Sequence, residues 1–401
     1  MTQATAAGWR DRPGLVVGVC TLAYLPFTLL GHGTDIDVGN VLRAGRSWLD
    51  HGEYHLSRNP GAAVHEVGTA ALEQVGGSVL VNLASVAFAA LALWAVHDLV
   101  RRDGGRWPTW AVVVLATNPW FWIAATSMGD FVWALALALA GAAAAQRDRR
   151  VAAGLLFGLA IGCRASTVLL VVAWLIAERS GASASRVSPR SVAVTAGIAL
   201  AVGVLCFVPP WLEAGRTMSF LENEFPFAGV GVHLGRWVVK NVAVVGPLAG
   251  VVLVVGLRQA VGGLARWRVS TMARFAVLTI VLSELLYFRF PFKPLHLLPV
   301  VAGLALLVGA SPLVTRRWLA VLVAAQLAGG LVGTTLAAPD VEDAAQSGSI
   351  ELGFTAGPLL TDVRCRLDDR ERGPWPNPGS DASTQRAAEN ARCQNATWRA
   401  G

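Results

Sequence analysis

Long apolar runs separated by short polar segments dominate the sequence from Gly14 to Ala338. A helix that crosses a membrane needs about 20 consecutive, mostly apolar residues, and runs of this kind recur throughout that region. We therefore predict an all-α, polytopic transmembrane protein. Spans are expected at about 14–31, 77–98, 109–125, 130–146, 192–212, 237–257, 274–288, 295–310 and 317–338, with two more in 151–178.

The stretch 151–178 can be interpreted in two ways. A single long helix would place Arg164 in the middle of the bilayer, where an unpaired arginine is costly. Two short helices that meet near Arg164 place this side chain at the outer surface instead. They also keep the arginines of 179–190 and 258–274 on the cytoplasmic side. We adopt the hairpin, which gives about eleven spans.

The distribution of charge predicts the orientation of these spans. Cytoplasmic loops of membrane proteins carry an excess of Lys and Arg. With an N-terminus inside and a C-terminus outside, the cytoplasmic loops hold Arg10, Arg12, Arg101, Arg102, Arg147, Arg149, Arg150, Arg179, Arg258, Arg266, Arg268, Arg316 and Arg317, among others. Most acids outside the tail then lie on the outer side. We expect a multi-pass protein of a cell membrane.

Composition agrees with this picture and excludes one class of partner. The chain is 54% hydrophobic and 15% charged, whereas soluble domains average about 25% charged residues. The net charge of +7 does not indicate nucleic acid, because the basic residues lie in short clusters between apolar runs. Membrane lipids are the expected surroundings.

A polar segment follows the last span, so we divide the chain into a transmembrane domain, 1–338, and a tail, 339–401. The orientation above places this tail outside the cytoplasm, where disulfides form and persist. Cys365 and Cys393 are therefore predicted to form one disulfide that closes a loop. A loose tail with two free thiols is the alternative.

The first outer loop, 32–76, is long and patterned. Apolar residues recur at helical spacing from Val38 to Leu49, which predicts a short amphipathic helix on the membrane surface. Asp37 would lie at the start of this helix, where a carboxylate also serves as a cap. Asp35 can be interpreted as a solvated loop acid. Both structural interpretations stay open beside a chemical role.

The order of features in this loop resembles the first outer loop of the GT-C superfamily of membrane glycosyltransferases. That superfamily includes protein mannosyltransferases and aminoarabinose transferases that act on lipid A. The resemblance extends over about 14–310, and no single motif in it is highly specific. Its motifs are the outer Asp37, a surface helix with Ala44 and Leu49, Gly52-x-Tyr54, Ser57-Arg58-x-Pro60-Gly61, a second surface helix from Val64, Asn118-Pro119-Trp120, Ser127-Met128-Gly129-Asp130, Gly154-x-x-x-Gly158, Gly162-x-Arg164 and the segment 289–299.

The resemblance implies transfer of a sugar from a polyprenyl-phosphate donor to an extracytoplasmic glycan, lipid or protein, with inversion at the anomeric carbon. It implies Asp37 as the base, assisted by Asp35. Many members have Asp-Glu at this position, whereas Val38 follows Asp37 here, so the match of the two aspartates is open. The donor phosphate would be bound by Arg164, Arg289, Lys293 and Arg58, and the acceptor by His65, Glu66 and Tyr54.

Each of these assignments has a structural alternative. Arg164 could pair with Asp130, and Arg289 and Lys293 could reach lipid headgroups. His65 and Glu66 could be ordinary residues at the start of a helix.

Two rival functions remain at this stage. A transporter or flippase of a lipid-linked saccharide would show repeated halves and interrupted helices, and no internal repeat is visible. A non-catalytic membrane scaffold would not depend on Asp37. No cofactor and no metal site are predicted, although the outer acids could bind a divalent cation.

Overall fold

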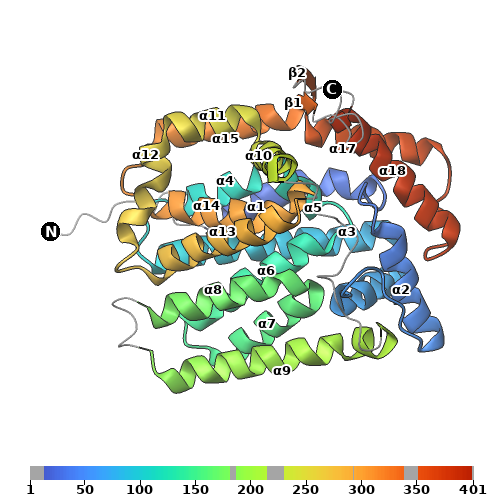
Figure 1. Cartoon of the computed structure of the whole chain (residues 1–401), viewed down its shortest axis with the longest axis horizontal. Helices are drawn as coiled ribbons and strands as arrows, with labels where there is room; N and C mark the ends of the chain where they lie inside the picture. The colour runs from blue at the N-terminus through green and yellow to red at the C-terminus, as the bar shows by residue number, and fades with distance from the viewer. Residues whose placement is uncertain (1–12, 181–186, 215–229, 292, 338–350, 400–401) are drawn as a thin grey trace.

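The computed structural model describes residues 13–180, 187–214, 230–291, 293–337 and 351–399. Most of its helices run roughly along the long axis of the molecule (Figure 1). The elements of the first half are α1 (Pro13–Tyr24), η2 (Leu25–Leu29), α2 (Val38–His51), α3 (Ala63–Arg102), α4 (Pro108–Ala116), α5 (Pro119–Ala125), α6 (Asp130–Gln146), α7 (Arg150–Cys163), η3 (Ala165–Thr167) and α8 (Val168–Arg179). The elements of the second half are α9 (Pro189–Ala214), α10 (Val230–Val245), α11 (Pro247–Val255), α12 (Leu257–Ala260), η5 (Val261–Arg266), α13 (Thr271–Arg289), η6 (Pro294–Leu297), α14 (Leu298–Ala310), α15 (Arg316–Leu331), β1 (Val332–Ala337), β2 (Glu351–Ala356), α17 (Pro358–Glu371) and α18 (Asp381–Arg399).

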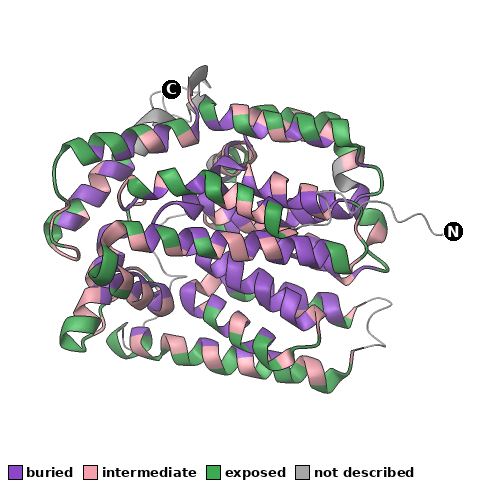
Figure 2. Cartoon of the chain, turned by 180° about the vertical axis from the view of Figure 1, so that it is seen from behind, coloured by how far each residue is buried: buried purple, intermediate pink, exposed green. Residues whose placement is uncertain are grey.

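Helix α6 forms the centre of the bundle. Every residue from Asp130 to Ala145 is buried, and Figure 2 shows that burial is concentrated in the central helices. The outer helices instead expose large apolar side chains, such as Leu200 and Leu205 on α9 and Val254 on α11. Exposed apolar surface on this scale is what a lipid-facing helix presents.

Helices α7 and α9 approach closely because glycines line the contact. A Cβ on Gly154 would lie 2.6 Å from Ile198, and one on Gly158 would lie 2.4 Å from Val202. Small residues four apart let the backbones of membrane helices come together. This contact fixes α7, whose last residue precedes Arg164.

The hairpin predicted in 151–178 is present. Helix α7 ends at Cys163 and α8 begins at Val168, with Arg164 between them. Arg150 at the start of α7 and Glu178 near the end of α8 form an ion pair of 2.7 Å, so the two helices return to the same end of the molecule.

Several expected spans differ from the observed elements, and 109–125 for example is divided between α4 and α5. The run 237–257 is divided at Gly246, where φ is +87°, and the helices on either side are bent by 91°. The expected span 317–338 ends as a helix at Leu331 and continues as β1. In α3, by contrast, a break at Gly76 and Gly77 separates a surface segment from the span expected at 77–98.

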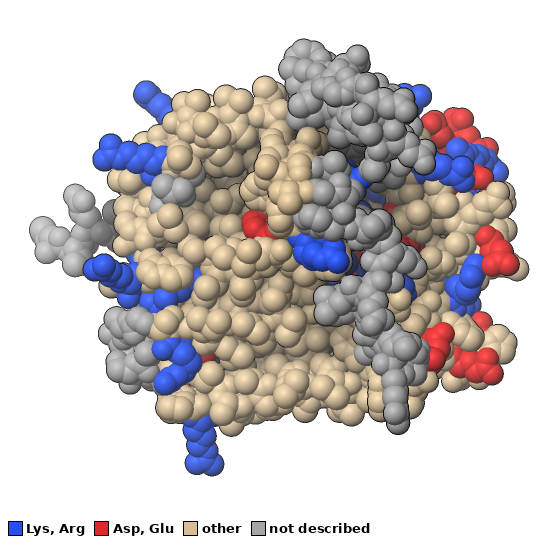
Figure 3. Space-filling model, in the orientation of Figure 1, with Lys and Arg blue, Asp and Glu red and all other residues tan. Residues whose placement is uncertain are grey.

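Three of the described helices are long and apolar enough to cross a membrane: Ala63–Arg102, Pro189–Glu213 and Thr271–Arg289. The number rises to five if each of two bent helix pairs counts as one span, so the figure of about eleven stays a prediction. On the face drawn in Figure 3, Lys and Arg dominate the left end, and Asp and Glu gather at the right end near α2 and α18.

The polar tail folds onto the right end of the bundle in Figure 1. Strands β1 and β2 form a two-stranded antiparallel sheet with Val332 opposite Ala356. Two helices that the hydropathy pattern does not predict, α17 and α18, follow. The disulfide between Cys365 and Cys393 joins them. Residues 338–350 lie outside the described part of the chain.

Candidate active site

The segment that precedes α2 brings two carboxylates to one ammonium group. Lys293 Nζ donates to Asp35 Oδ1 over 2.7 Å and to Asp37 Oδ2 over 3.0 Å. The backbone N–H of Asp37 also donates to Asp35 Oδ1, at 2.9 Å. Asp37 occupies the cap position of α2, but its side chain makes no capping hydrogen bond. Its carboxylate therefore pairs with the neighbouring cations and does not cap the helix.

Arg58 links these carboxylates to a third one at the start of α6. Its Nη1 donates to Asp37 Oδ2 at 2.5 Å, and its Nη2 donates to Asp130. Arg164 Nη1 donates to both oxygens of Asp130 at 2.9 Å, so the pairing of Arg164 with Asp130 is present. Arg164 Nη2 in turn lies 3.2 Å from His296 Nε2.

These contacts form a closed ring. His296 belongs to η6, which begins immediately after Lys293. The contact of Arg164 with His296 therefore closes the ring at the segment that carries Lys293. The ring contains three carboxylates and three cations, and its formal charges cancel when His296 is neutral: Asp35, Asp37 and Asp130 against Arg58, Arg164 and Lys293. Each buried carboxylate faces a cation, which offsets much of the cost of removing it from water.

The neighbours of Asp37 and Lys293 determine their protonation. Burial raises the pKa of the Asp37 carboxyl, but Lys293 and Arg58 lower it by more, so this pKa lies below its usual value. Burial lowers the pKa of Lys293, and Asp35 and Asp37 outweigh that effect and raise it. Both side chains are therefore charged at neutral pH.

A cavity of about 100 Å³ lies beside Asp35 and Lys293. Its apolar wall comes mainly from α5 and α6, and its polar wall includes a second ammonium group, Lys240 of α10. Asp35 Oδ2 is buried and has no hydrogen-bond partner among the described residues. The lining includes Thr34, Asp35, Trp120, Ile123, Ser127, Phe131, Lys240, Lys293 and, from the tail, Ala391.

Glu66 organises the loop that carries Arg58. Its carboxylate accepts hydrogen bonds from the Tyr54 and Ser57 hydroxyls, from the Ser57 N–H at 3.4 Å and from the Ala62 N–H at 3.3 Å. Because Glu66 is fully buried, these bonds fix the loop. The geometry thus gives Tyr54 and Glu66 a supporting position behind Arg58, and neither lines the cavity.

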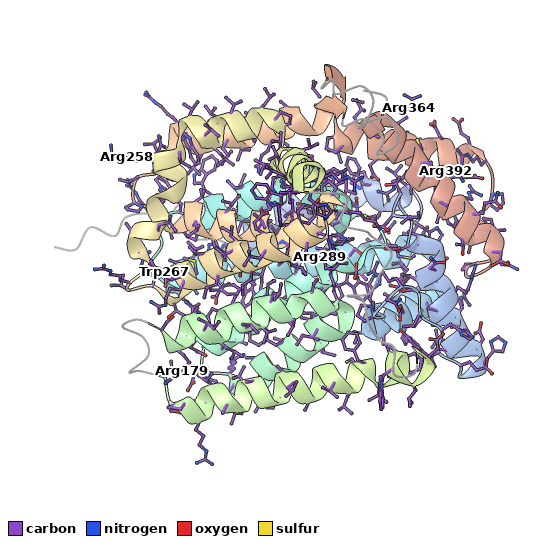
Figure 4. All side chains as sticks on the ribbon, viewed as in Figure 1. Arg179, Arg258, Trp267, Arg289, Arg364 and Arg392 are labelled. Carbon is purple, nitrogen blue, oxygen red and sulfur yellow. A yellow bond between two sulfur atoms is a disulfide. The ribbon has the colours of Figure 1, made fainter. Side chains whose placement is uncertain are left out.

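Two further predicted site residues lie apart from the cavity. His65 Nε2 is 3.3 Å from the Thr69 hydroxyl, and its ring packs edge-on against Trp133. Arg289 is exposed at the end of α13 with its guanidinium 4.5 Å from the centre of the Phe290 ring. Figure 4 places Arg289 on the near face of the bundle. It forms no ion pair with any residue that the structure describes.

A metal centre is not evident in this region. The described residues contain no group of three or more His, Cys, Asp or Glu side chains arranged to hold a metal ion. Each carboxylate of the ring is paired with at least one cationic nitrogen.

Comparison with known proteins identifies the architecture. No family model and no curated protein match the sequence. The structure is similar to that of ArnT from Cupriavidus metallidurans bound to undecaprenyl phosphate, with a TM-score of 0.57 and 15% identity over 98% of this chain and 78% of that one. The apo state of the same protein gives a TM-score of 0.53 and 16% identity at the same coverage. The chain has a GT-C-like fold.

A third similarity is weaker. The arabinosyltransferase EmbB from Mycobacterium smegmatis matches at 16% identity over 77% of this chain and 31% of that one, with a TM-score of 0.47. This match is too weak to carry an inference.

In this GT-C-like fold, three residues that the sequence did not assign to the site belong to it or line its cavity. Asp130 is the most central, since it joins Arg58 to Arg164 while its side chain is only 1% exposed. Its signal was an acid at the start of an apolar run, where burial demands a cationic partner. His296 and Lys240 carried no comparable signal, because only the folded chain brings them to this end.

Proposed function

We propose that this protein is an integral membrane glycosyltransferase. It transfers a sugar from a polyprenyl-phosphate donor to a glycan, lipid or protein acceptor on the outer face of the membrane, with inversion. The observation that carries this proposal is the cavity lined by Asp35, Lys240 and Lys293, since one oxygen of Asp35 has no hydrogen-bond partner among the described residues. The undecaprenyl phosphate bound by the structurally similar ArnT supports a lipid-linked phosphate as the donor.

The carboxylates divide the work in this proposal. A base must accept the proton of the acceptor hydroxyl as its oxygen bonds to the anomeric carbon. The sequence favours Asp37 as the base, whereas the geometry favours Asp35, because Asp35 lines the cavity and Asp37 does not. Asp37 then holds Lys293 and Arg58 in place through its two ion pairs.

The cations serve the leaving group. As the bond between the anomeric carbon and the phosphate oxygen breaks, its electron pair stays on the phosphate. Positioned cations stabilise such developing charge. Lys293 and Lys240 line the cavity, so we propose that they contact this phosphate. Arg289, on the near face of the bundle, would meet the lipid carrier as it approaches.

Arg58 and Arg164 have a different place in the proposal. Each guanidinium already binds a carboxylate of the ring, and neither residue lines the cavity. They would act on the phosphate through the ring, by keeping Asp37 and Asp130 in position.

A transporter or flippase of a lipid-linked saccharide is the second candidate. Two bent helix pairs support it. Helices α5 and α6 meet at a bend of 99°, and α10 and α11 at a bend of 91°. Interrupted helices near a binding site are typical of transporters. Such a protein would move the donor without cleaving it.

The two candidates differ in a direct assay. Purified protein in lipid nanodiscs is incubated with radiolabelled polyprenyl-phosphate sugars and a membrane extract as the source of acceptors. Transferase activity predicts label in a product separate from the carrier, and a reduction of more than about 100-fold in the Asp35→Asn variant. Transfer that survives in both Asp35→Asn and Asp37→Asn would refute the catalytic assignment. Movement of intact donor across the bilayer, with no transfer, would favour the transporter.

A further inference from the structure

We propose that the C-terminal helices α17 and α18 hold residues 31–37, the catalytic loop, in place. We propose further that Asp362 is the positioning residue for Asp35. This inference rests on the proposed function, in which Asp35 acts as the base. It assigns to the polar tail a direct part in the geometry of the site.

The central contact joins the two ends of the described chain. Thr34 Oγ1 donates a hydrogen bond of 2.7 Å to Asp362 Oδ1. Thr34 is the residue before Asp35, and Asp362 is fully buried. The backbone that carries the proposed base is thus tied by one side chain to α17. Displacement of a catalytic group by about 1 Å can reduce turnover by about 100-fold.

Arg366 anchors Asp362 and the same loop. Its Nη1 donates to Asp362 Oδ2 at 3.1 Å, and its Nη2 donates to the carbonyls of Gly31 at 3.2 Å and Thr126 at 2.7 Å. Nη2 also reaches the Phe27 carbonyl, at 3.0 Å. The last carbonyls of a helix lack partners within the helix, so one buried guanidinium satisfies the ends of both η2 and α5. The start of the loop is therefore fixed at Gly31.

Helix α18 contacts the first half of α2, the helix that follows the loop. Arg43 of α2 donates to Asp381 Oδ1 at 2.6 Å and to Thr384 Oγ1 at 2.8 Å. Gly39 lies so close to α18 that an added Cβ would be 2.4 Å from the Thr384 Cα. Because Ala391 also lines the cavity, the tail both holds the loop and forms part of the wall.

A tail that only covered the end of the bundle would not need these polar contacts. Apolar residues of similar size often stabilise a buried position as well as an ion pair does. Here the inward face of α17 instead carries a fully buried carboxylate and a guanidinium that is 1% exposed. The carboxylate contacts the catalytic loop at Thr34, and the guanidinium contacts it at Gly31. This is the arrangement expected of a positioning device.

The first test does not require activity. Hydrogen exchange of the backbone amides of residues 31–37 is measured by mass spectrometry on purified protein, for the wild type, Asp362→Ala and Thr34→Val. We expect at least a several-fold faster exchange in both variants. Arg364→Ala is the control, because Arg364 lies on the exposed face of α17 and pairs only with Asp368 among the described residues. It should leave the exchange unchanged.

The second test separates positioning from general stability. In the transfer assay, Thr34→Val and Asp362→Ala should each lower kcat about ten-fold or more while the KM for the donor stays within about two-fold. Thr34→Ser keeps the hydroxyl and should restore most of the activity. The double variant should be no worse than Asp362→Ala alone, since Asp362→Ala already removes the contact with Thr34.

The outcomes distinguish this inference from the proposed function. Unchanged exchange in residues 31–37, or unchanged kcat in Thr34→Val, would overturn the inference even if transfer is confirmed. If the wild type transfers no sugar but exchange in the loop rises in both variants, the proposed function fails and the structural hold on the loop stands. Should Asp362→Ala fail to fold, Thr34→Val decides the question alone.

Discussion

Asp35 and Asp37 share one lysine but differ in their other contacts. Asp37 also binds Arg58, and its carboxylate is held by two cations. Asp35 lines the cavity, and one of its oxygens is buried without a hydrogen-bond partner in the part of the chain that the structure describes. Two carboxylates only two residues apart are therefore suited to different tasks, one to contact a substrate and one to maintain the positions of the cations.

The pH dependence of transfer should reveal the link between Asp37 and Lys293. Lys293 is the first of the charges that lower the pKa of Asp37. The Lys293→Met variant removes this cation, so the pKa of Asp37 rises and the carboxylate is protonated at a higher pH. The acid limb of the profile of kcat against pH should move to higher pH in this variant.

A matched control for this prediction is Arg364→Met, which removes one positive charge from the exposed face of α17. Its profile should coincide with that of the wild type. An acid limb that stays in place in Lys293→Met would show that the ionisation of Asp37 does not limit turnover.

At this scale the sequence indicated several members of the ring but not its closure. Arg164 and Asp130 were a candidate pair because each needs a partner near an apolar run. The contact of Lys293 with Asp35 joins residues 258 positions apart, and no local pattern specifies it. Arg289 and Lys293 look alike in sequence, yet only Lys293 reaches the acids.

Among the elements, α17 shows why the tail was hidden from a hydropathy pattern. Its buried residues include Asp362, Cys365, Arg366 and Asp369, which recur at the spacing of one helix face. That face is polar because its side chains form hydrogen bonds with a loop and with helix ends. Its sequence therefore resembles that of a solvent-exposed segment. The break between α10 and α11 was hidden for the opposite reason, since Gly246 and Pro247 lie within a continuous apolar run.

The disulfide between α17 and α18 should stabilise the tail. It closes a loop across a sequence separation of 28, for which the loss of chain entropy in the unfolded state corresponds to about 3–4 kcal/mol. The double variant Cys365→Ser and Cys393→Ser should lower the free energy of unfolding of the tail by about this amount. Denaturant-dependent proteolysis of the tail, read at Arg370 or Arg372, measures it.

A free cysteine offers the control for that experiment. Replacing Cys206, which is not disulfide-bonded, by Ser should leave the susceptibility of the tail unchanged. Equal protection of the tail in the double variant and the wild type would show that the ion pair of Asp369 with Arg386, at 2.6 Å, suffices to join the helices.

The whole molecule is polarised along its long axis. Figure 4 shows Arg179 and Arg258 at one end, and Arg364 and Arg392 at the other. The cavity and the ring lie towards the second end, where α2, α17 and α18 gather. We propose that this end faces outward, in keeping with the charge of the loops at the first end.

Labelling in intact cells tests this orientation. A membrane-impermeant maleimide should label Glu371→Cys, on α17, and should label Arg258→Cys only after the cells are opened. Both positions are exposed, so accessibility within the fold does not limit either reaction. The reverse pattern of labelling would place the site on the cytoplasmic side.

The hydrogen bond between Thr34 and Asp362 spans 328 positions of the sequence, which has a consequence for biosynthesis. Helix α1 emerges from the ribosome long before α17 is translated. The loop that follows this helix must therefore wait, only partly constrained, until nearly the entire polypeptide has been inserted. A protein interrupted during its synthesis can form most of the bundle, but it has no means of completing the geometry around Asp35.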